Sequence, residues 1–190
     1  MQDINMGLMQ DFRLTIPTLL EHAAANHGST EVVARQQDGS VFRYTYTDLA
    51  NRSRQAANSL QRLGVQYGEV VGTLAWNHHW HMECFYAIPG IGAVCHTINP
   101  RLFEEQIVYI INHARDKVLM VDQDFVDLAE RIVDQIPGIE QFIILGPKGC
   151  VEAPTRLGEV LYYDDLIADE PTTIDWPEFD ERSASGLCYT

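Results

Sequence analysis

The stretch Val70–Leu102 constrains the fold more than any other part of this 190-residue chain. Within it, an apolar run at 69–75 is followed by an apolar helix-like segment at 79–89 and by a second apolar run at 93–97. A strand, a helix and another strand within so short a distance are typical of a parallel β-α-β unit. The stretch therefore predicts a parallel sheet with at least one crossover helix.

The same alternation continues along the chain. Two further apolar runs, at 117–121 and 141–145, come with helix-like patterns at 103–114 and 125–136. All of these runs are almost continuously apolar, as expected for strands that helices cover on both faces of a sheet. We therefore predict an α/β fold with a parallel, helix-flanked sheet and right-handed crossovers.

The N-terminal part of the chain carries a different pattern. An apolar segment at 16–25 predicts a first helix, and the β-prone runs at 31–36 and 41–45 flank an Asp-Gly pair. Such a pair between two strands is typical of a β-hairpin turn. Thr45 and Asp48 match a capping box, with Asp in place of Glu, so a second helix is expected to begin there.

Composition excludes several classes of protein. The chain is long enough for one domain with a real core. Its 13 Lys and Arg residues against 27 Asp and Glu residues give a net charge of −14. A surface with this charge repels phosphate backbones and anionic lipids, so no nucleic-acid partner is expected. Since no apolar run approaches the length that a bilayer requires, we predict no transmembrane segment.

The cysteines and the N-terminus bear on the cellular setting. None of the four cysteines, Cys84, Cys95, Cys150 and Cys188, forms a CxxC pair. We therefore expect a reduced, cytoplasmic setting rather than a disulfide framework. The first residues are acidic and lack a basic region followed by an apolar one, which predicts no signal peptide.

One cluster of side chains has the residue types of a metal site. His78, His81 and Cys84 share one face of the helix expected at 79–89. There is no HExxH pattern, however, and no distant Cys/His pair to complete a tetrahedral set of ligands. The sequence therefore favours a polar helix start over a metal centre.

Polar residues also follow the predicted strands. Asn99-Pro100-Arg101 lies just after the run at 93–97, at the edge where open α/β sheets bind ligands. The pattern favours a strand-to-helix turn, with Arg101 in solvent or paired with an acidic neighbour. Asp122 and Asp124 are expected to cap the next helix. Local patterns alone thus identify no catalytic residue within this chain.

Several blocks of the sequence resemble the adenylate-forming, AMP-binding acyl-CoA synthetases, with the greatest likeness to bacterial medium- and long-chain fatty acid–CoA ligases. The blocks are TLAWN at 73–77, YAIPGIGAV at 86–94, HTINPRL at 96–102 and ERSASGLCYT at 181–190. The likeness runs from about Pro17 to Thr190. It is weakest over 146–180, which is expected to be an irregular acidic segment apart from one short helix at 162–168.

The resemblance implies where this chain lies in the family's fold. Residues 1–190 would be the N-terminal part of the large AMP-binding domain, truncated at Thr190, with the C-terminal domain absent. The family's phosphate-binding loop, of the type (S/T)GTTGxPKG, would begin after Thr190, so residues that bind the nucleotide are unknown here. Thr190 matches the threonine before that loop, and by resemblance it is a candidate Mg²⁺ ligand.

The resemblance also implies an activity for the parent protein. A fatty acid–CoA ligase uses ATP and Mg²⁺ to convert a fatty acid to its acyl-adenylate, and then transfers the acyl group to CoA. The parent is further expected to form a homodimer through this N-terminal portion, and the 190-residue chain alone is expected to be inactive.

Two alternatives stay open. The chain could be a non-catalytic binding or dimerisation module. The parent could instead be an adenylate-forming ligase for an aryl acid or a short sulfur-containing acid. The acyl pocket is expected beyond this chain, so the sequence does not separate these substrates.

Overall fold

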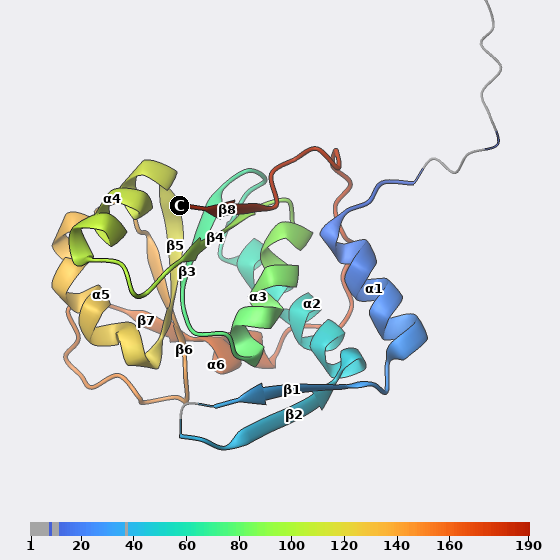
Figure 1. Cartoon of the computed structure of the whole chain (residues 1–190), viewed down its shortest axis with the longest axis horizontal. Helices are drawn as coiled ribbons and strands as arrows, with labels where there is room; N and C mark the ends of the chain where they lie inside the picture. The colour runs from blue at the N-terminus through green and yellow to red at the C-terminus, as the bar shows by residue number, and fades with distance from the viewer. Residues whose placement is uncertain (1–7, 9–11, 37) are drawn as a thin grey trace, which may run out of the picture.

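The computed structural model describes residue 8 and residues 12–36 and 38–190, and it has the predicted α/β architecture (Figure 1). Gln37 of the predicted turn lies outside the described residues, as does most of the N-terminal segment for which no signal peptide is predicted. The strands are β1 (Glu31–Arg35), β2 (Val41–Thr45), β3 (Val70–Leu74), β4 (Val94–Ile98), β5 (Asp116–Asp122), β6 (Gln141–Leu145), β7 (Val160–Tyr162) and β8 (Gly186–Cys188).

Strands β3 to β8 form one six-stranded sheet in the order β7-β6-β5-β3-β4-β8. Every neighbouring pair in this sheet is parallel. The predicted parallel sheet is therefore confirmed, and the apolar runs found in the sequence form its four inner strands. The hairpin of β1 and β2 is antiparallel and separate from this sheet.

Helices cover both faces of the large sheet (Figure 1). The α-helices are α1 (Ile16–His27), α2 (Tyr46–Arg62), α3 (His79–Gly90), α4 (Glu104–Ala114), α5 (Val126–Ile132) and α6 (Tyr163–Ala168). Helices α2, α3 and α6 enclose one apolar core, which includes Val71 and Cys95. Helices α4 and α5 enclose the other, which includes Leu74 and Ile98. Alternate residues of a strand face opposite cores, which explains the continuous apolar runs.

The N-terminal hairpin and the helix after it form as predicted. Thr45 Oγ1 accepts the backbone N–H of Asp48 at 3.2 Å, and Asp48 Oδ2 accepts the backbone N–H of Thr45 at 2.9 Å. This capping box starts α2 directly at the end of β2. The ring of Phe42 in β2 stacks on the ring of His79 at a centroid distance of 3.9 Å, so the hairpin packs against the start of α3.

One helix is shorter than expected. The helix expected over 125–136 is α-helical only in α5, with a 3₁₀ turn at each end. Its first turn closes early because Asp122 accepts the N–H of Asp124, and it ends at Ile136, where the following proline disfavours helical backbone. Within the acidic segment 146–180, the short helix expected at 162–168 is present as α6, and strand β7 precedes it.

The parallel register brings the loops after β3, β4, β5 and β8 to one edge of the sheet, because the carboxyl ends of parallel strands lie at the same edge. Among the helices in the described part of the chain, none combines the length and apolar composition needed to cross a bilayer.

Candidate functional site

A cavity of about 470 Å³ lies at the carboxyl edge of the central strands. Its walls come from the loop after β3, from the turn after β4 and from the end of β8, and they include Trp76, Asn99, Arg101 and Tyr189. Three segments that are far apart in the sequence thus meet where open α/β sheets bind ligands. We regard this cavity, called the edge cavity below, as the candidate functional site.

Arg101 is the main source of positive charge at the edge cavity. The Asn99 side chain accepts the backbone N–H of Arg101 at 3.0 Å and thereby shapes the turn after β4. The Arg101 guanidinium lies 5.9 Å from the centre of the Trp76 ring, within the range of a cation–π interaction. In the part of the chain that the structure describes, no carboxylate forms an ion pair with it. The predicted turn is present, and the Arg101 guanidinium is available to bind an anion.

The loops after β3 and β5 are joined by a buried pair, His78 and Asp122. His78 Nδ1 accepts the backbone N–H of His81 at 3.2 Å and so caps α3. The other ring nitrogen therefore carries the proton, and it donates to Asp122 Oδ2 at 2.6 Å. Asp122 also accepts the N–H of Asp124, which confirms the predicted cap. The pair thereby fixes the start of α3 against the end of β5.

The residues with metal-ligand chemistry point to different partners. His81 is buried, and burial lowers its pKa to about 4, so the ring is neutral at pH 7. Its Nδ1–H donates to the Trp76 carbonyl at 3.1 Å, and its Nε2 accepts the Thr73 hydroxyl at 3.0 Å. Cys84 instead contacts the sulfur of Met120 at 3.2 Å inside the core. Within the described residues, no three His, Cys, Asp or Glu side chains are placed to bind a metal.

Thr190, the candidate Mg²⁺ ligand, is exposed and directly follows Tyr189 of the cavity wall. The sequence alone assigned no role to Trp76 or Tyr189, and it did not predict that His78 pairs with Asp122. The available signal was position, because Trp76, His78 and Asp122 come just after the strands predicted at 69–75 and 117–121, and Tyr189 lies in the block at 181–190.

A comparison with known protein families identifies the family of this chain. The family model for AMP-binding enzymes matches residues 20–190. The chain belongs to this family. The resemblance seen in the sequence is therefore confirmed.

Individual relatives show which kinds of CoA ligase the chain is similar to. The chain is 45% identical over 185 residues to a 3-methylmercaptopropionyl-CoA ligase of Ruegeria lacuscaerulensis, and that match covers 97% of the chain. It is 40% identical over 185 residues to a medium-chain-fatty-acid–CoA ligase of Ectopseudomonas oleovorans, again over 97% of the chain. In both cases the match covers 34% of the relative, so the chain spans about a third of the length of these proteins.

A solved structure shows the same architecture. The anthranilate CoA ligase AuaEII, in complex with anthranoyl-AMP, superposes with a TM-score of 0.82 at 25% identity. The superposition covers 95% of this chain and 33% of that ligase.

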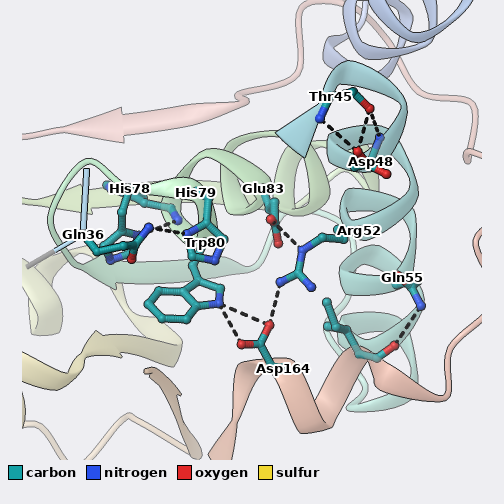
Figure 2. A network of polar contacts seen from close by, with 12 residues as sticks. Gln36, Thr45, Asp48, Arg52, Gln55, His78, His79, Trp80, Glu83 and Asp164 are labelled. Carbon is teal, nitrogen blue, oxygen red and sulfur yellow. Dashed lines mark hydrogen bonds and ion pairs between the residues drawn. The ribbon is translucent and has the colours of Figure 1, made fainter. Parts of the chain in front are cut away.

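In this member of the AMP-binding family, a polar network ties helices α2, α3 and α6 together (Figure 2). Arg52 of α2 donates to Glu83 of α3 at 2.8 Å and to Asp164 of α6 at 2.6 Å. The Trp80 indole N–H donates to Asp164 at 3.1 Å. Glu83 is completely buried, and a single acidic residue on this mostly apolar helix was the sequence signal for the network.

Glu83 gives the stability of the protein a defined pH dependence. Burial raises its pKa from 4.5 to about 7, although Arg52 opposes the shift. The folded state therefore keeps a proton at pH values where the unfolded chain has lost it. The stability that this group contributes is complete below pH 4.5 and is lost as the pH rises through 7.

We expect this dependence to disappear in Glu83→Gln. Between about pH 5 and about pH 7.5, the wild-type free energy of unfolding should fall relative to that of the variant by on the order of 2–3 kcal/mol. Urea unfolding across this range measures the difference. The control is Glu105→Gln, which removes an equal charge from an exposed site. A difference between the wild type and Glu83→Gln that stays constant with pH would contradict the account.

Proposed function

We propose that this chain is the N-terminal part of the large AMP-binding domain of an acid–CoA ligase, with a C-terminal domain elsewhere in the parent protein. The observation that carries the proposal is the edge cavity, whose walls include Arg101 and also Tyr189, the residue before Thr190. Membership of the AMP-binding enzyme family supports the ATP-dependent chemistry. The parent would convert a carboxylic acid to its acyl-adenylate with release of pyrophosphate, and CoA would then displace AMP.

Thr190 fits the role of a Mg²⁺ ligand. Mg²⁺ favours oxygen ligands and is usually held by one or two protein groups, by water and by substrate phosphates. A single exposed hydroxyl beside a phosphate-binding edge suits this mode of binding, whereas a site made wholly of protein ligands would not use it. When bound, Mg²⁺ neutralises charge that develops on the phosphates during adenylation. Arg101 would add positive charge at the same edge.

We propose a fatty acid as the acid substrate, and the similarity to a medium-chain-fatty-acid–CoA ligase supports this choice. The alternative of a short sulfur-containing acid has its own support in the similarity to a 3-methylmercaptopropionyl-CoA ligase. We place no catalytic residue within the described chain, so we propose that residues 1–190 alone are inactive. The reading as a non-catalytic module is the competing proposal.

Incubation of the full-length parent with ATP, Mg²⁺, CoA and a panel of acids tests these proposals. We expect pyrophosphate release that depends on the acid, and thioester formation that depends on CoA. The panel contains octanoate, 3-methylmercaptopropionate and benzoate, and the largest kcat/KM identifies the substrate class. Absence of pyrophosphate with every acid would overturn the ligase proposal. Pyrophosphate release by the 190-residue chain would overturn its predicted inactivity.

Substitution of Arg101 tests its role at the edge cavity. In the full-length protein, Arg101→Ala is expected to raise the KM for one anionic substrate about tenfold or more, because it removes a charged partner. The KM of Arg101→Lys should lie between those of the wild type and of Arg101→Ala. Arg131→Ala is the control, since this exposed arginine of α5 pairs with Glu104 away from the cavity. Unchanged KM values for acid, ATP and CoA in Arg101→Ala would exclude the role.

We also propose that the parent is a homodimer formed through this portion. A groove of about 320 Å³ between β1 and α3 supports the proposal, because Val33 and Phe85 line it and are 51% and 44% exposed. Light scattering at micromolar concentration should give the mass of a dimer for the full-length protein. Val33→Glu should shift the mass toward the monomer, whereas Leu19→Glu on α1 should not. A monomeric mass for the unaltered protein would contradict the proposal.

A further inference from the structure

Tyr189 is attached to the body of the protein by side chains on two other elements. It follows β8, an edge strand of three residues that pairs only with β4. Its hydroxyl lies 2.6 Å from Nδ1 of His113 in α4. Its ring lies 5.2 Å from the ring of His96 in β4. A short edge strand is held weakly by its backbone alone, so these side-chain contacts add to what holds Tyr189 in place.

His96 is itself fixed by a buried carboxylate. Its Nδ1 lies 2.8 Å and 2.9 Å from the two carboxylate oxygens of Asp116, and both side chains are completely enclosed. The pair reaches across β3 at Gly72. A Cβ at Gly72 would lie 2.6 Å from Asp116 Oδ2 and 2.8 Å from Leu119 Cδ1. The glycine therefore provides the space in which the pair forms.

Burial of the His96–Asp116 pair is energetically unfavourable compared with apolar packing. His96 Nε2 is buried and has no hydrogen-bond partner among the described residues. Burial also raises the pKa of Asp116, against the stabilising effect of His96 on its charged form. An apolar side chain could fill the same volume without a buried carboxylate or an unpaired nitrogen. The pair instead gives the His96 ring one defined orientation, against which Tyr189 packs.

We propose that Asp116, His96 and His113 form a clamp on Tyr189, and that this Tyr189 clamp sets the direction in which the chain leaves β8. It thereby positions Thr190 and the residues after it for the phosphates of the nucleotide. The four residues are positioning residues and touch no reacting atom. The part that concerns the nucleotide rests on the proposed function, whereas the clamp itself does not.

Hydrogen exchange on the full-length protein tests the clamp directly. Tyr189→Phe keeps the ring against His96 but removes the hydroxyl that contacts His113. We expect backbone amides of the peptide at 186–190 to exchange roughly three- to tenfold faster, with those of β6 unchanged. Tyr109→Phe is the matched control, because Tyr109 stacks on His113 through its ring at 5.4 Å. Equal exchange in Tyr189→Phe and the wild type would overturn the clamp.

A second substitution tests whether one interaction is responsible. His113→Phe keeps a ring beside Tyr109 and Tyr189 but has no nitrogen. If the hydroxyl and the imidazole act through the same bond, each single variant should exchange as fast as the double variant. Fully additive effects would show that the two residues act separately, which contradicts the clamp.

Kinetics of the full-length protein test the nucleotide part of the proposal. Tyr189→Phe should raise the KM for ATP severalfold, and it should leave the KM for the acid unchanged. If exchange changes but the KM for ATP does not, the clamp does not position the nucleotide. If the wild-type protein releases no pyrophosphate with any acid, the proposed function fails, and the exchange experiment still decides the clamp.

Discussion

The parallel pairing of β3 with β4 on one side and β5 on the other is the constraint on which the rest of the structure depends. Each connection between these strands must return across the sheet, and the helices α3 and α4 make these returns. Both faces of the strands are then covered, which gives the two apolar cores. The carboxyl ends of the strands have no such cover, so the polar loops gather there and form the edge cavity.

The loops of this edge owe their shape to a few buried polar contacts. His78 and Asp122 join the start of α3 to the end of β5. Arg52 of α2 ties Glu83 of α3 to Asp164 of α6. A buried charge without its partner costs several kcal/mol, so each contact strongly favours one arrangement. Arg101, in contrast, faces the cavity and rests on Trp76. Such a scaffold can orient an anionic substrate while supplying little chemistry of its own.

Much of the fold could be predicted from local patterns. The continuous apolar runs predicted the four longer strands of the parallel sheet, and Thr45 with Asp48 predicted the start of α2. Strand β7 was missed because three residues are too few to show a period. The extent of α5 was misjudged because the side chain of Asp122 tightens the first turn, an effect that apolar spacing does not reveal.

The candidate site was less predictable, since its contacts join residues that are distant in the sequence. Asn99-Pro100-Arg101 was placed correctly at the sheet edge, because a strand end can be predicted. Its stacking on Trp76 and its lack of a carboxylate partner within the described chain required the structure. The histidines after β3 showed the chemistry of metal ligands, and only their packing shows that they bond to protein groups.

The most direct test of the central claim is a crystal structure of the full-length parent with a non-hydrolysable ATP analogue and Mg²⁺. The account predicts density for the triphosphate at the carboxyl edge of β3, β4 and β8, beside Tyr189 and Thr190. Nucleotide density at another edge or face of the sheet, with the edge cavity remote from it, would contradict the account.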